Sequence, residues 1–153
     1  RLDKYAVRAG GGWNHRGGLF DAILIKDNHL AQLAAEGLDP GQAVSRARAF
    51  VAQTFPPERA AAMVVEVEID LLDDLPAVLA AGADIVLLDN MGPTALRAAV
   101  AMRDAASPGV VLEASGGISL DTVREIAEAG VDRISSGWPT HDAPWLDFGL
   151  DWA

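Results

Sequence analysis

The sequence predicts an α/β protein built on a parallel (β/α) barrel, of which this chain holds about five βα strands. Short runs rich in β-branched residues alternate with Ala-rich stretches, which indicates βα units with right-handed crossovers. Charged residues recur at or near the expected strand ends, from Lys26 to Glu68, Asp89 and Glu113, at intervals of 42, 21 and 24 residues. A complete barrel takes about 250 residues. The 153 residues of this chain therefore predict an incomplete barrel that lacks earlier strands.

The expected elements follow from hydrophobic periodicity. Strands are predicted at 22–26, 63–69, 85–89, 110–113 and 131–135. Helices are predicted at 41–54, 71–81, 93–105 and 119–129. Pro93 near one helix start, Ser119 as an N-cap, and Gly82 and Gly130 just past two helix ends mark these boundaries. The polar run at 27–29 is interpreted as part of a loop.

A barrel is favoured over a flat, doubly wound sheet by the carboxylates of strand 63–69. Successive side chains of a strand point to opposite faces, so Glu66 and Glu68 share one face and Val65, Val67 and Ile69 the other. The apolar face is expected to pack under helices. Inward carboxylates are tolerated in a barrel lumen that opens onto a site. We therefore expect the charged strand ends to converge at one rim.

Composition excludes several classes of protein. There is no cysteine, which excludes disulfide scaffolds and Cys-based zinc sites. A net charge of −10 argues against general nucleic-acid binding, and no apolar run approaches the roughly 18 residues of a membrane span. We therefore expect a cytoplasmic protein. Residues 1–29 nevertheless carry a net charge of +2, which favours a small anionic ligand.

Cationic candidates lie in this first segment. Three glycines precede His15 and Arg16, so the backbone can approach a ligand while Arg16 presents a fork suited to carboxylate or phosphate. A flexible surface loop is the alternative. Lys26 ends an apolar strand, where it would bind an anion or form a Schiff base, or simply be a solvated lysine.

Acidic candidates lie at strand ends. Glu68 and Asp89 are hard oxygen ligands suited to Mg²⁺ with phosphates, or else structural partners of Arg or Lys. Glu113 carries the same ambiguity.

Small-residue turns after the last two strands suggest phosphate binding. Ser115, Gly116 and Gly117 precede an expected helix, and Gly137 follows the last strand. His141 lies nearby, although a lone histidine is more often a packing or capping residue.

These segments resemble the quinolinate phosphoribosyltransferase family. The likeness is carried by KYAVRAGGGWNHRGGLFDAILIKDNH (4–29), VEVE (65–68), LLDNM (87–91), EASGGI (113–118) and SGWPTH (136–141). The resemblance implies transfer of phosphoribosyl from phosphoribosyl pyrophosphate to quinolinate with decarboxylation, giving nicotinate mononucleotide, CO₂ and pyrophosphate in NAD synthesis. It further implies that 1–153 is the C-terminal barrel domain, truncated at its N-terminal side and without the N-terminal domain. A homodimer or higher homo-oligomer of the full-length protein is implied. The composition, as argued above, predicts neither nucleic acid nor a membrane as a partner.

The resemblance also assigns roles. His15, Arg16 and Lys26 are implied to bind the quinolinate carboxylates. Glu68 and Asp89 are implied to hold Mg²⁺ and the ribose pyrophosphate, and with Lys26 to be catalytic. The phosphate contacts are implied to be Ser115, Gly116, Gly117, Gly137 and His141.

Two departures from the family pattern qualify these roles. The Thr-Arg-Lys stretch of the family would lie upstream of Arg1, so we expect the 153-residue chain alone to be inactive or barely active. The turn reads Trp138-Pro139 where the family usually has Ala-Leu, which leaves the role of His141 open.

Three rival functions stay open. One is a related phosphoribosyltransferase for nicotinate or for the substrate of the molybdenum-associated paralogue. The others are a Schiff-base aldolase built on Lys26 and a non-catalytic phosphate-binding or assembly module.

Overall fold

Five parallel strands form one sheet, and their order in the sheet is their order along the chain. The computed structural model describes residues 2–142, 144, 146, 147 and 149–151. The strands are β1 (Ala22–Ile25), β2 (Val64–Ile69), β3 (Ile85–Asp89), β4 (Val111–Ser115) and β5 (Arg133–Ile134). Parallel neighbours need a crossover between them, so each connection returns across the sheet. All carboxyl ends therefore meet at one edge.

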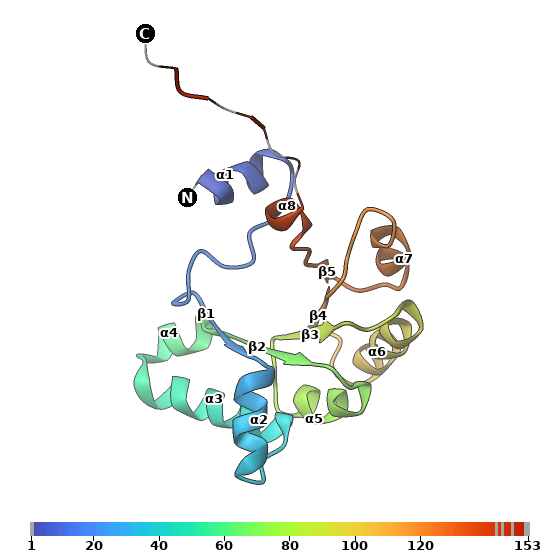
Figure 1. The fold of residues 1–153 in the computed structure, drawn as a ribbon. Helices are drawn as coiled ribbons and strands as arrows, with labels where there is room; N and C mark the ends of the chain where they lie inside the picture. The colour runs from blue at the N-terminus through green and yellow to red at the C-terminus, as the bar shows by residue number, and fades with distance from the viewer. Residues whose placement is uncertain (1, 143, 145, 148, 152–153) are drawn as a thin grey trace.

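Helices occupy both sides of this sheet. The crossovers contain α2 (Asp27–Ala35), α3 (Pro40–Thr54), α4 (Pro57–Ala62), the 3-10 turn η1 (Leu72–Asp74), α5 (Leu75–Ala80), α6 (Pro93–Ala106) and α7 (Val123–Glu128). Helix α1 (Leu2–Ala9) precedes β1, and α8 (Trp138–His141) follows β5. In Figure 1, α2, α3, α5, α6 and α7 lie around one side of the sheet, whereas α1 and α8 lie on the other. We call the side of α1 and α8 the inner face.

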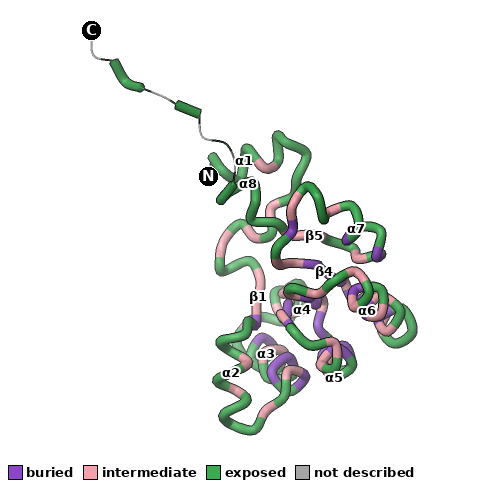
Figure 2. Tube along the Cα trace, turned by 45° about the vertical axis from the view of Figure 1, so that its right-hand side comes forward, coloured by how far each residue is buried: buried purple, intermediate pink, exposed green. Residues whose placement is uncertain are grey.

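The hydrophobic core lies between the sheet and the crossover helices. Val65, Val67 and Ile69 of β2 are at most 1% exposed, as the alternation predicts. Val86 and Leu88 of β3 join them, packed with buried residues of α3, α5 and α6. Figure 2 shows that burial concentrates in these central elements, whereas α1 and α8 are exposed. The core therefore uses one side of the sheet and leaves the inner face to other side chains.

The α/β class, the five strands and their parallel pairing are confirmed. Strand β1 pairs with β2 and β5 with β4, and among the described residues the sheet does not close. No helix in the part of the chain that the structure describes is long and apolar enough to cross a bilayer.

Three local predictions were wrong. The run at 27–29 is not a loop but the first turn of α2, because the His29 ring accepts the Lys26 backbone N–H in a capping box. Ser119 does not begin a helix: 119–122 form a turn, and α7 starts only at Val123. Glu113 does not end its strand, since β4 continues to Ser115.

Candidate active site

A pocket of about 730 Å³ opens on the inner face of the sheet. It lies between α1, the loop that follows α1, and the turns after β4 and β5. Its lining includes eight residues that the sequence singled out: His15, Arg16, Lys26, Glu113, Ser115, Gly116, Gly117 and Gly137. The structure thus brings together two groups of candidates, one cationic and one rich in glycine, that lie about 90 residues apart in the sequence.

Helix α1 positions the loop that carries His15 and Arg16. The Lys4 ammonium donates to the Arg16 carbonyl at 2.7 Å, and the Asn14 amide donates to the Lys4 carbonyl at 3.0 Å. Farther along, the Asp21 carboxylate accepts the backbone N–H groups of Gly17 and Gly18. These bonds hold a glycine-rich segment in one course over the sheet.

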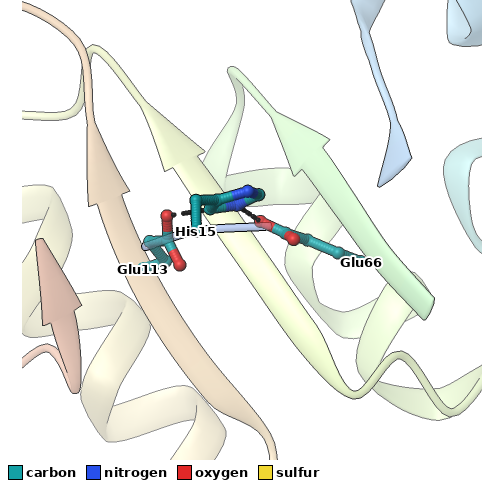
Figure 3. Close-up of side chains that lie close together, drawn as sticks. All are labelled: His15, Glu66 and Glu113. Atoms are coloured by element: carbon teal, nitrogen blue, oxygen red, sulfur yellow. Dashed lines mark hydrogen bonds and ion pairs between the residues drawn. The ribbon is translucent and has the colours of Figure 1, made fainter. Parts of the chain in front are cut away.

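His15 lies between two buried carboxylates (Figure 3). Its Nε2 is 3.1 Å from Glu66 Oε1 and 3.5 Å from Glu113 Oε1, while Glu66 and Glu113 are 2% and 1% exposed. The hydrogen bond to Glu66 raises the pKa of His15; burial opposes this rise, and the charges of both carboxylates add to it. The three side-chain atoms lie within 4.8 Å of one another.

Lys26, Glu68 and Asp89 meet at the carboxyl ends of β1, β2 and β3. Lys26 Nζ lies 3.4 Å from Glu68 Oε2. Burial raises the pKa of Glu68; Lys26 opposes that rise, and the nearby Asp89 adds to it. A cation bound between the Glu68 and Asp89 carboxylates would relieve this repulsion, so the donor set fits a hard cation. Glu68 and Asp89 stand beside the pocket and do not line it.

Asn90 fixes the end of β3. It has φ 54°, and its side-chain amide donates to Asp89 Oδ2 at 2.6 Å while its backbone N–H donates to the Ser115 carbonyl at 2.9 Å. Gly116 packs directly against it: a Cβ at Gly116 would come 2.8 Å from the Asn90 backbone nitrogen. Only glycine fits there, so the turn after β4 and the carboxylate at the end of β3 are held in register.

The last turn places its two candidates differently. Gly137 lines the pocket, but His141 does not. A Cβ at Gly137 would lie 3.1 Å from His141 Cδ2, so the imidazole packs against the backbone of the turn. His141 is exposed and lies beside the backbone of this turn, outside the pocket lining.

Sequence reasoning missed the contributions of Lys4, Asn14 and Asn90. The side chains of Lys4 and Asn14 donate hydrogen bonds to backbone carbonyls, and no sequence motif predicts such contacts. Asn90 carried a signal, because asparagine is among the few residues other than glycine that adopt a left-handed conformation readily.

Comparisons with known proteins show the family to which the chain belongs. Residues 1–151 match the family described as quinolinate phosphoribosyl transferase, C-terminal domain. The chain is 45% identical over 150 residues to the nicotinate-nucleotide pyrophosphorylase [carboxylating] of Mycobacterium leprae, covering 98% of this chain and 48% of that protein. The human protein of the same name is 38% identical over 149 residues, covering 97% and 46%.

A solved structure, NadC from Streptococcus pyogenes, superposes with a TM-score of 0.78 at 37% identity, covering 98% of this chain and 47% of that one. The chain therefore spans about half the length of the relatives it matches.

Proposed function

Since the chain belongs to the quinolinate phosphoribosyltransferase family, in which it matches the C-terminal domain, we propose that the complete protein makes nicotinate mononucleotide for NAD synthesis. It would transfer phosphoribosyl from phosphoribosyl pyrophosphate to quinolinate, releasing CO₂ and pyrophosphate. Relatives named carboxylating nicotinate-nucleotide pyrophosphorylases support the proposal. It concerns the complete protein, because this chain spans about half of those relatives.

One observation carries the proposal: the pocket joins cationic groups to a glycine turn. His15, Arg16 and Lys26 line one part, and Ser115 to Gly117 line another. Quinolinate is a dianion at neutral pH, and a guanidinium with an ammonium suits its two carboxylates. Among the described residues, the backbone N–H groups of Gly116 and Gly117 donate no hydrogen bond, and such a turn suits a phosphate. A site for both substrates in one cavity is what a bimolecular transfer needs.

Glu68 and Asp89 would hold Mg²⁺ at the edge of this pocket. When bound, the ion supplies charge neutralisation for the pyrophosphate. The bond between Asn90 and Asp89 Oδ2 occupies one carboxylate oxygen and so orients the other. Lys26, ion-paired with Glu68, links this group to the quinolinate side of the pocket.

The chemistry then depends on positioning. The ring nitrogen attacks C1 of the ribose as the bond to pyrophosphate breaks, and the nitrogen becomes cationic. Loss of CO₂ from ring position 2 leaves its electron pair on that carbon, where the cationic nitrogen stabilises it until a proton replaces the carboxyl group. The protein's contribution is to hold the ring against the sugar and exclude water.

Turnover by the complete protein tests this proposal. With phosphoribosyl pyrophosphate and Mg²⁺, quinolinate should give nicotinate mononucleotide and one CO₂ per molecule of that product. Nicotinate offered in place of quinolinate should give no nicotinate mononucleotide. Arg16→Ala should raise the KM for quinolinate about 10-fold or more, because a charged hydrogen bond to a carboxylate is lost. Equal use of nicotinate by the unaltered protein would contradict the proposal.

A Schiff-base aldolase on Lys26 finds less support. Such a lysine is activated by desolvation or a neighbouring cation. The Lys26 side chain is half exposed and is paired with the Glu68 carboxylate.

A further inference from the structure

Two buried carboxylates on the inner face have no role in the reaction proposed above. Glu66 comes from β2 and Glu113 from β4, with β3 between them, and each is at most 2% exposed. Burying a carboxylate is costly unless hydrogen bonds and opposite charge compensate it. The groups that compensate these two therefore indicate what they do.

His15 is the partner that Glu66 and Glu113 share. A carboxylate only accepts hydrogen bonds, so the nitrogen 3.1 Å from Glu66 Oε1 must carry a hydrogen. The second carboxylate lies 3.5 Å from the same nitrogen. In Figure 3 the ring lies across β3 with one carboxylate on each side. The orientation of the imidazole is thus set from both neighbouring strands.

The other ring nitrogen of His15, Nδ1, is available to bind the substrate. Within the described residues, His15 Nδ1 has no hydrogen-bond partner, and His15 lines the pocket. To donate to a carboxylate of the substrate while Nε2 donates to Glu66, the ring must carry both hydrogens.

We propose that Glu66 and Glu113 are positioning residues for the anionic substrate, which hold His15 as an imidazolium with Nδ1–H directed to a quinolinate carboxylate. The inference rests on the proposed function for the identity of that anion. Neither glutamate touches substrate in this scheme. Both act through His15.

The surrounding charges support this arrangement. His15 is flanked by Glu66 from β2, Glu113 from β4 and Arg16 from its own loop, and the pocket also holds Asp3 and Lys4 of α1 and Lys26. Glu113 has further partners on β5 and beyond it, because Ser135 Oγ donates to it and Arg133 Nη1 lies 4.0 Å away. The hydrogen bond to Glu66 is the main cause that raises the pKa of His15, burial opposes it, and the charge of Arg16 lowers it. Glu66 should therefore matter more than Glu113.

Simple electrostatic repulsion between Glu66 and the substrate predicts a change in binding of the opposite sign. If Glu66 were only a negative charge near the pocket, removing it would strengthen binding of a dianion. If Glu66 maintains the imidazolium, removing its charge weakens binding. The sign of the change therefore separates the two explanations.

Quinolinate binding to the protein, measured by calorimetry across pH 6 to pH 9, provides the test. Glu66→Gln keeps the shape and one acceptor oxygen but loses the charge, and we expect about 10-fold weaker binding, with a smaller loss for Glu113→Gln. The loss should shrink as the pH falls, because solution protons then supply the imidazolium. Glu128→Gln, which alters an exposed surface pair with Arg124, is the matched control and should bind as the unaltered protein does. Unchanged or tighter binding in Glu66→Gln would overturn the inference.

An NMR titration of the His15 ring hydrogens without substrate separates this inference from the proposed function. The pKa of His15 should be lower in Glu66→Gln and Glu113→Gln than in the unaltered protein, and unchanged in Glu128→Gln. If the unaltered protein binds no quinolinate but the pKa falls in both variants, the substrate is wrong and the role of the glutamates stands. If the pKa does not fall, the glutamates do not maintain the imidazolium, whatever the protein binds.

Discussion

At the scale of single residues, the conformation of Asn90 links two parts of the site. Its positive φ turns the chain so that the amide reaches Asp89 and the backbone N–H reaches Ser115. Left-handed backbone costs a non-glycine residue on the order of 1 kcal/mol, which the surrounding contacts must offset. Gly116 makes this possible because it leaves the space that a side chain would fill. Asp89 and the glycine turn therefore depend on each other.

Replacement of Gly116 by alanine tests this dependence. The new Cβ would meet the Asn90 amide and backbone while φ at Gly116 is +87°. We expect Gly116→Ala to lower the free energy of unfolding by about 2–4 kcal/mol, because strain and a backbone clash add. Denaturant unfolding of the protein would measure it.

Two other glycines are controls for this substitution. Gly117 has φ +61° but no atom within 4 Å of a Cβ, so Gly117→Ala should cost about 1 kcal/mol from backbone strain alone. Gly109 has open space and no positive φ, so Gly109→Ala should change stability by less than about 0.5 kcal/mol. Equal effects at Gly116 and Gly117 would show that the contact with Asn90 is not tight.

At the scale of elements, Asp132 joins β4 to α6. Its carboxylate accepts the Leu112 backbone N–H at 2.8 Å and pairs with the buried Arg103 guanidinium, which also donates to the Val110 carbonyl. Burial raises the pKa of Asp132, but the bonds from Leu112 and Arg103 outweigh it and hold that pKa below its usual value. A depressed carboxyl pKa means stability that is present above pH 3.8 and is lost as the pH falls through the folded-state pKa.

Asp132→Asn should therefore destabilise the protein at pH 7 but not in acid. The expected loss in the free energy of unfolding at pH 7 is about 1–2 kcal/mol. It is smaller than for a fully buried ion pair because the Asp132 side chain is 40% exposed. In urea unfolding, the difference between the two proteins should shrink as the pH falls below 3.8 and through the folded-state pKa of Asp132. Asp104→Asn is the control, since Asp104 pairs with the same arginine but is 60% exposed. A difference that does not shrink below pH 3.8 would mean that packing, not charge, is lost.

Local sequence patterns predicted most of the strands and helices, but not all of their boundaries. Five strands and the long helices were predictable because buried β-branched runs and helical periodicity reflect packing of one face. The start of α2 was not predictable from the sequence, because lysine at the N-cap and histidine at the third helical position are unusual residues for a capping box. The segment 119–122 was placed in a predicted helix, but Ser119, Asp121 and Thr122 are residues that favour caps and turns. Its backbone forms a turn in which the Thr122 hydroxyl accepts the Ser119 N–H.

The site was predictable in part for a similar reason. Charged residues at strand ends follow from topology, so Lys26 and Glu68 were expected to meet, and they do. The contact of His15 with Glu66 and Glu113 was not expected. It depends on how a glycine-rich loop crosses the sheet, and local sequence preferences do not specify that path.

At the scale of the whole molecule, the chain is held together in two ways. The sheet and crossover helices share a continuous apolar core. Helix α1 and the loop at 10–21 instead lie over the inner face through polar contacts, among them those of Lys4, Asn14 and His15. Segments with few buried apolar contacts open at lower free energy than the core. We therefore expect this inner cover to open locally while the sheet stays folded.

The docking of this cover should depend on pH through His15. The pKa of His15 is raised above its ordinary value of 6.5, so its contribution is fully present below about pH 6.5 and is lost as the pH rises through the folded-state pKa. Amide hydrogen exchange, corrected for the intrinsic effect of pH, should show protection at Gly17 and Gly18 declining over that range. Protection at Val65 and Val67, which are fully buried, should hold constant. His15→Gln removes the titrating group and should abolish the pH dependence. If protection in the unaltered protein does not change with pH, the bonds of Lys4 and Asn14 suffice to hold the loop, and the ion pair of His15 adds nothing to docking.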